Sequence, residues 1–162
     1  PRRGVRMLAR RLFVLLLALA AAYPDAGALG QLARFPTAEL TILTRSGPHK
    51  FTIELANTPD QMTQGLMFRQ SLAPDAGMLF AYSPPAIATM WMKNTLIPLD
   101  MLFVDEHGII VNIGERTVPG SLAAIAAAAP VRAVIELNGG TAARLGIRPG
   151  DRVLFPLFGT AR

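Results

Sequence analysis

The sequence has no cysteine and only two histidines. Without cysteine, the chain forms no disulfide, no thiolate zinc site and no cysteine nucleophile. His49 and His107 each fall in a segment whose composition predicts a turn, and two such distant imidazoles are too few for a histidine metal site. The sequence also lacks a Gly-x-Ser-x-Gly elbow, a phosphate-binding loop and a dinucleotide fingerprint. We therefore expect no metal, no cofactor and none of the familiar enzyme signatures.

Charged residues are scarce as well. They make up 17% of the 162 residues against 51% hydrophobic residues, which excludes charge-driven disorder and suits one domain with one core. The net charge is +5, but five arginines precede residue 28, where Asp25 is the only acid, and the remainder has eleven bases and ten acids. A domain so close to neutral lacks the excess of positive charge that binding to a phosphate backbone requires. We therefore expect no nucleic-acid partner.

The first 28 residues have the pattern of a signal peptide. Arg10 and Arg11 precede an uncharged apolar run over residues 12–22. A Tyr-Pro-Asp break over residues 23–25 and three small residues over 26–28 follow, as at a cleavage site. As a helix, the eleven-residue run would span about 16 Å, well short of the about 30 Å core of a bilayer.

These features predict a signal peptide over residues 1–28, a linker over 29–38 and a single domain over 39–162. The domain is then exported, either to the periplasm or out of the cell, and meets the membrane only transiently. The paired arginines leave the general and the twin-arginine export routes open. A buried helix of the domain is the alternative interpretation of the apolar run.

Alternating apolar residues predict mostly short antiparallel strands. Residues 40–44 and 51–55 flank a Ser-Gly-Pro turn, and residues 99–104 and 109–113 flank an Asp-Glu-His-Gly turn, so each pair predicts a hairpin. Residues 122–129 are either a short helix or a packed connection. Further strands are expected over residues 78–82, 88–94, 131–137 and 153–155. We expect a mainly β (α+β) fold, a compact sheet that curls on itself or a small barrel.

Two short helices complete the expected fold. Thr58 and Pro59 suit the N-cap and first position of a helix of about three turns, which we expect to run to Arg69. A second helix over residues 142–145 should end at Gly146, which suits a left-handed C-cap.

Carboxylates within predicted strands are the unusual feature of the sequence. The two-residue period of a strand places Asp100 on the face of Leu102 and Val104, and Glu136 on the face of Val134. An unpaired buried charge costs several kcal/mol or is neutralised by a shifted pKa. A carboxylate on a covered face therefore needs a partner.

Arg69 and Lys93 are the candidate cationic partners. Lys93 shares a predicted strand face with Trp91, the only tryptophan. If both cations converge with Asp100 and Glu136 beside the indole, the result is a polar ligand pocket with a stacking platform. A structural salt-bridge network, or strand faces that are simply solvated, is the alternative.

The glycines of residues 138–141 could present backbone N–H groups to an anion at the start of the second helix. Glycines at such a corner more often serve the turn itself. We favour the turn.

The methionines raise the question of a soft metal, because thioethers bind Cu(I) in oxidising compartments. Met62 and Met67, however, fit the buried stripe of a helix, and Met90 and Met92 share one face of a strand. We therefore expect core packing instead. The methionines considered are Met62, Met67, Met78, Met90, Met92 and Met101.

Five segments closely resemble the family called domain of unknown function 192 (DUF192). They are Met62-x2-Gly65-Leu66-Met67-Phe68-Arg69, Gly77-Met78-Leu79-Phe80, Met90-Trp91-Met92-Lys93-Asn94-Thr95, Leu99-Asp100-Met101 and Val134-Ile135-Glu136-Leu137-x2-Gly140. The resemblance covers residues 40–156 and implies a small β-rich domain, often exported, with no established biochemical role and no assigned catalytic residue. The family pattern includes Arg69, Trp91, Lys93, Asn94, Asp100 and Glu136.

We expect a non-enzymatic, exported domain that binds a small polar ligand such as a carbohydrate. The candidate binding residues are Arg69, Trp91, Lys93, Asn94, Asp100 and Glu136. One alternative is a glycoside-acting enzyme whose acid/base pair is Asp100 and Glu136, with carboxyl groups about 5 to 10 Å apart. Another is a structural or interaction module of the envelope, which an exposed apolar patch around residues 84–85 or 155–158 would mark. The oligomeric state stays open.

Overall fold

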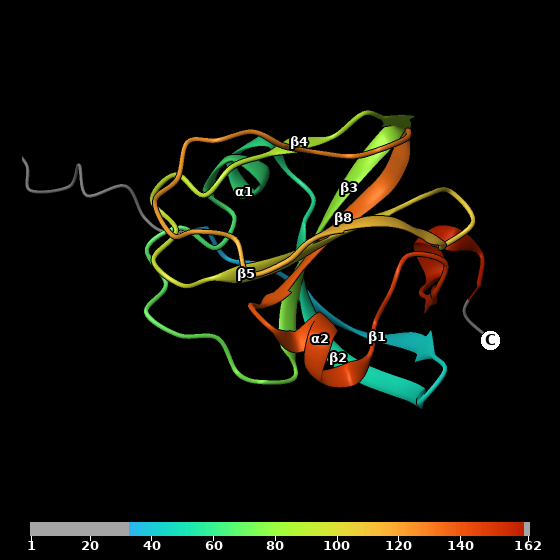
Figure 1. Cartoon of the computed structure of the whole chain (residues 1–162). Helices are drawn as coiled ribbons and strands as arrows, with labels where there is room; N and C mark the ends of the chain where they lie inside the picture. Colours follow the sequence, from blue (N-terminus) through green and yellow to red (C-terminus); the bar gives the residue numbers. More distant parts are fainter. Residues whose placement is uncertain (1–32, 161–162) are drawn as a thin grey trace, which may run out of the picture. The chain divides into compact units, whose positions relative to one another are not determined.

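The computed structural model describes residues 33–160 (Figure 1). The predicted signal peptide and its cleavage site lie outside the described residues. Within residues 33–160, none of the helices has the length and apolar character needed to span a bilayer. The elements are β1 (Thr37–Thr44), β2 (Gly47–Ala56), α1 (Pro59–Gln64), β3 (Ala76–Ala86), β4 (Thr89–Met90), β5 (Leu99–Val104), β6 (Ile110–Gly114), β7 (Ile125–Ala126), β8 (Val131–Asn138), α2 (Thr141–Leu145), β9 (Arg152–Leu154) and a 3-10 turn, η2 (Pro156–Phe158).

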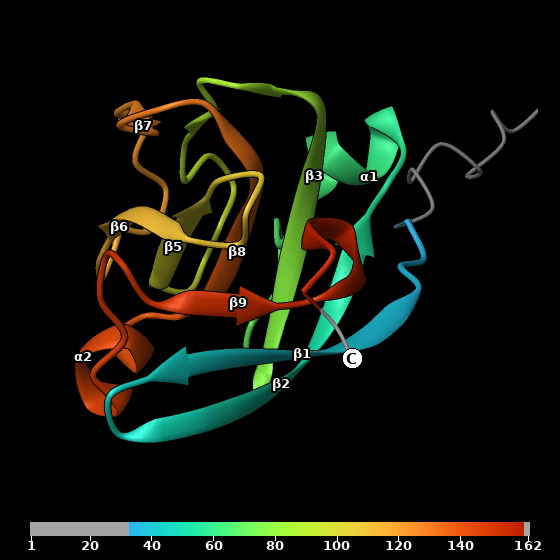
Figure 2. The same ribbon diagram turned by 90° about the vertical axis from the view of Figure 1, so that its right-hand side faces the viewer.

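Seven of the strands form one curled sheet in the order β6-β5-β8-β3-β2-β1-β9 (Figure 2). Only β2 and β3 pair in parallel, because α1 connects them; the other neighbours are antiparallel. The sheet is a half-barrel, and β4 and β7 form a separate two-stranded ribbon. The predicted mainly β fold with a curled sheet and two short helices is confirmed.

Both predicted hairpins are present, as β1–β2 and β5–β6. The strand expected over residues 78–82 is longer than predicted, because β3 continues to Ala86. Its register with β8 shifts between Ala81 and Ala86, so the two prolines lie in an irregular stretch that needs no ladder hydrogen bonds there. Of the strand expected over residues 88–94, only β4 forms.

The two helices form where the sequence places their starts, and the first is shorter than expected. Thr58 caps α1 in a capping box with Gln61, but α1 ends at Gly65, whose φ of 49° leaves the helical region. Gly146 ends α2 with a left-handed φ of 69°, as predicted.

The curled sheet buries apolar side chains on both of its faces. Leu102 and Val104 of β5 belong to one hydrophobic cluster, whereas Met101 and Phe103 of the same strand belong to the other. All six residues of β5 are buried. A strand covered on both faces has no solvated side to receive a charge, and this placement decides the environment of Asp100.

Candidate functional site

Asp100 is completely buried on the Leu102 face, the face that its sequence position predicts. Its carboxylate accepts backbone hydrogen bonds from the N–H groups of Arg116 at 2.8 Å, Gly140 at 2.9 Å and Ala142 at 2.7 Å. Three donors of this kind stabilise a buried carboxylate without a cation. The prediction that Arg69 or Lys93 pairs with Asp100 is therefore wrong, since backbone amides replace the cation.

The same contacts explain the glycine corner before α2. Gly140 adopts a left-handed φ of 89° and, with Ala142, directs its N–H at Asp100. A Cβ on Gly139 would lie 2.9 Å from the Cβ of Pro98, so the close approach of the chains requires glycine there. The corner binds an anion after all, but that anion is the internal Asp100 carboxylate.

Glu136 lies on the other face of the sheet. In the β5–β8 register Asp100 is opposite Leu137, and Met101 is opposite Glu136. Residues directly opposite each other share a face, so the two carboxylates point to opposite sides of the sheet. The structure therefore contradicts the proposed acid/base pair, which requires both groups in one cleft.

Arg69 is engaged by a residue that the sequence argument did not select. Its guanidinium donates two hydrogen bonds to the Glu54 carboxylate, at 2.7 Å and 2.6 Å, and stacks near the ring of Phe35. The alternation of apolar and polar residues in β2 predicts which face of the strand Glu54 occupies. It does not indicate which cation pairs with the Glu54 carboxylate. The predicted convergence of two cations and two carboxylates does not occur.

Trp91, Lys93 and Asn94 do lie together at the surface, in the segment that follows β4. The indole is 49% exposed, and the Lys93 ammonium lies 5.1 Å from its ring centroid, within cation–π range. Asn94 has a left-handed φ of 55°, and its carbonyl accepts the N–H of Phe68 at 2.9 Å. Beside the indole runs a groove of about 290 Å³, lined by Thr89, Met90, Trp91, Leu122 and Ala124; we call it the Trp91 groove.

A smaller cavity of about 40 Å³ shares Met90 and Trp91 with this groove. Residues of α1 and of β4 line it, together with Glu136 of β8. We call it the Glu136 cavity. Its lining residues are Met62, Thr63, Gln64, Gly65, Leu66, Met67, Phe80, Met90, Trp91, Thr95 and Glu136.

Glu136 is only 4% exposed, and burial raises its pKa from 4.5 to about 8. The carboxyl group is therefore mostly protonated at neutral pH. Burial, followed by the charge of Glu136, also raises the pKa of the Tyr82 hydroxyl. Burial is the cause of the Glu136 shift. A nearly buried carboxyl group thus lines the cavity.

The structure divides the methionines into two groups. Met78, Met92 and Met101 are fully buried in the core, as expected. Met62, Met67 and Met90 are only half-buried and line the Glu136 cavity, so core packing alone does not describe them. The sulfurs of Met90 and Met67 accept weak contacts from the Tyr82 hydroxyl at 3.5 Å and the Asn94 amide at 3.9 Å, respectively.

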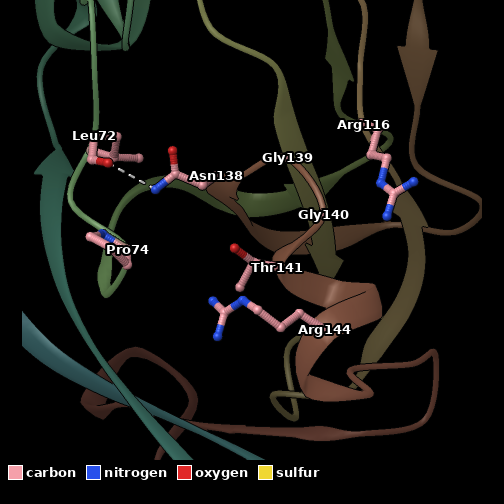
Figure 3. A pocket seen from close by; sticks show the side chains of 8 residues that line it. All are labelled: Leu72, Pro74, Arg116, Asn138, Gly139, Gly140, Thr141 and Arg144. Atoms are coloured by element: carbon pink, nitrogen blue, oxygen red, sulfur yellow. Dashed lines mark hydrogen bonds between the residues drawn. The ribbon is translucent and has the colours of Figure 1, made fainter.

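A depression of about 680 Å³ lies at the glycine corner (Figure 3). The exposed guanidinium groups of Arg116 and Arg144 line it, and neither forms an ion pair within residues 33–160. The Asn138 amide donates to the carbonyls of Leu72 and Ala73. The backbone N–H groups of Gly140 and Ala142 at this corner already donate to Asp100. They are therefore not available to bind a ligand in the depression.

The described residues contain no group of three or more His, Asp or Glu side chains close enough to hold a metal ion. Of the two places named for an exposed apolar patch, residues 155–158 do not form one, because Phe155 and Phe158 are buried. Pro84, Pro85 and Ile87 are exposed. Most of the large exposed apolar side chains belong to segments that hydrogen bonds bring together around Trp91. They are Phe68, Trp91, Leu96, Val118 and Leu122.

Comparisons with known proteins agree with the sequence resemblance. The model of the DUF192 family, described as "Uncharacterized ACR", matches residues 41–155. A crystal structure from Sinorhizobium meliloti 1021, named as that of a candidate transcription regulator, is 48% identical, with a TM-score of 0.72, and covers 75% of this chain and 95% of its own. A protein of unknown function from Novosphingobium aromaticivorans DSM 12444 is 43% identical, with a TM-score of 0.73, and covers 83% of this chain and 91% of its own. No curated protein matches.

Proposed function

This chain belongs to the DUF192 family, and from that premise we propose that it is an exported, non-enzymatic domain of the cell envelope that binds a small polar ligand in the Trp91 groove. The observation that carries the proposal is the half-exposed indole beside a groove of about 290 Å³. That volume suits a ligand about the size of one or two rings, since pockets for larger molecules range up to about 1,000 Å³.

The chemistry of the groove favours a ligand with one flat apolar face and several hydroxyl groups, such as a carbohydrate. The indole offers a stacking surface for such a face. Lys93 is exposed with its ammonium over the ring, where it can orient hydroxyl groups. Asn94 is exposed in the same segment, and its amide contacts the Met67 sulfur at 3.9 Å. Arg69 and Asp100 have no part in this site, because each is already held by other groups of the chain.

The rival interpretations lose support from the same geometry. A glycoside-acting enzyme based on Asp100 and Glu136 would need carboxylates that the sheet instead separates. The name given to the Sinorhizobium protein would predict DNA binding for this chain. Residues 33–160, however, carry ten bases and ten acids, which does not favour a phosphate backbone as a ligand.

Export is supported by the signal-peptide pattern of the first 28 residues, and it places the ligand among molecules of the envelope or the medium. The Trp91 groove lies within the domain that would remain after cleavage. Ligands to test first are therefore the sugars of envelope polymers.

A calorimetric screen of mono- and disaccharides against the wild type and Trp91→Ala tests the proposal. We expect Trp91→Ala to weaken binding about tenfold or more, equivalent to about 1.4 kcal/mol, because the stacking surface is lost. Lys93→Ala should have a smaller effect. Ile87→Ala is the matched control, since Ile87 is equally exposed but lies outside the groove. Equal affinities of Trp91→Ala and the wild type for a bound sugar would refute the assignment.

A further inference from the structure

We infer that the Glu136 cavity is a binding site for a soft monovalent metal ion, Cu(I), held by the thioether sulfurs of Met62, Met67 and Met90. This inference goes beyond the proposed function, because it concerns the inner cavity and a different kind of ligand. Thioethers select Cu(I) among the ions available to proteins. Three thioether side chains line this one cavity.

No other soft ligand competes for such an ion within the described chain. The sequence has no cysteine. The imidazole of His49 contacts the hydroxyls of Thr44 and Ser46 in the β1–β2 hairpin, and His107 lies in the β5–β6 turn. Neither histidine lines the Glu136 cavity. The methionine sulfurs are therefore the donors on which a soft ion would depend.

The size of the cavity favours an ion. Its volume of about 40 Å³ is close to the roughly 30 Å³ that one water molecule occupies in the liquid. A sugar ring does not fit into such a space, which keeps this cavity distinct from the Trp91 groove.

The polar groups of the cavity wall include one carboxyl. The Thr63 hydroxyl donates to the Pro59 carbonyl at 2.8 Å, and the Thr95 hydroxyl to the Lys93 carbonyl at 3.3 Å. The Glu136 carboxyl is 4% exposed and lines the same cavity. A cation in the cavity would lie beside its oxygen atoms, which are polar groups in a largely apolar wall.

Trp91 reports on the environment of the ion. Its indole lines the cavity as well as the outer groove, and the Lys93 ammonium lies 5.1 Å from its ring centroid. Because it is the only tryptophan of the chain, its fluorescence reports on this one place. An ion bound next to the ring should quench the emission.

Competition of the purified full chain with the Cu(I) chelator bicinchoninate, under anaerobic reducing conditions, tests the inference. We expect one equivalent of Cu(I) to bind and to quench Trp91. Met62→Leu, Met67→Leu and Met90→Leu should each weaken binding about tenfold or more, because leucine keeps the bulk and removes the sulfur. Met92→Leu is the matched control: its thioether is fully buried, accepts the Thr117 hydroxyl at 3.1 Å and does not line the cavity, so Cu(I) affinity should not change.

Two outcomes would overturn the inference: no Cu(I) bound by the wild type, or equal Cu(I) affinities for the wild type and the three cavity variants. Thermal unfolding of each variant shows whether it is folded, and Ag(I), a redox-stable soft ion, should reproduce the Cu(I) results. Zn(II) should not compete. Sugar binding should survive Met62→Leu, because Met62 does not line the Trp91 groove, so a failure of one proposal is distinguishable from a failure of the other.

Discussion

Replacing Glu136 by Gln should make the protein more stable at neutral and mildly alkaline pH. Burial raises the pKa of Glu136 from 4.5 to about 8, so the folded state holds a proton that the unfolded state releases. The advantage of the protonated carboxyl is fully present below about pH 4.5 and is lost as the pH rises to about 8.

The size of the effect follows from the proton difference between the two states. Each pH unit between these two values lowers the free energy of unfolding of the wild type by about 1.4 kcal/mol. From pH 5 to pH 8 the loss from this one group amounts to about 4 kcal/mol. Glutamine has nearly the same shape and carries no titrating proton, so the variant does not share this loss.

Urea unfolding of both metal-free proteins at several pH values measures the difference. We expect similar midpoints near pH 5 and a gap that widens up to pH 8 in favour of Glu136→Gln. Other titrating groups are common to both proteins and largely cancel in the comparison. Parallel stability curves for the two proteins would show that Glu136 is not held in a desolvated site and would refute the reasoning.

Four further outcomes are expected. Asp100→Ala leaves three backbone N–H groups without their acceptor and should lower the free energy of unfolding by about 3 kcal/mol; an unchanged urea midpoint would contradict this. Gly139→Ala places a Cβ 2.9 Å from that of Pro98 and should cost about 1 to 3 kcal/mol in the same assay. Acrylamide should quench Trp91 to an intermediate degree; fluorescence that resists quenching would indicate a buried ring. N-terminal sequencing of the exported product should start near Leu29, and an intact, membrane-held chain would rule out cleavage.

Much of the fold was accessible from local patterns. The hairpins at residues 40–55 and 99–113 followed from alternation around turn residues, and the start of α1 followed from Thr58 and Pro59. The two-residue period also gave Asp100 its correct face within β5. Hairpins, helix starts and strand faces depend on residues that are close together in the sequence, so local sequence patterns are enough to predict them.

The composition of the candidate site was predicted only in part. Trp91, Lys93 and Asn94 are consecutive in the chain or nearly so, and the sequence argument placed them together. Arg69 was expected at the same place but pairs with Glu54. A long charged side chain reaches several partners, and only the packing of α1 and β2 selects one of them.

The sequence by itself determined the two hairpins, the faces of β5 and β8 that Asp100 and Glu136 occupy, and where the helices begin. Only the tertiary structure decided that Asp100 and Glu136 lie on opposite sides of the sheet, because that depends on the register between β5 and β8. It also decided that Asp100 is held by backbone N–H groups 16 to 42 residues away. Every residue except proline carries such a donor, so a backbone partner leaves no trace in the side-chain sequence.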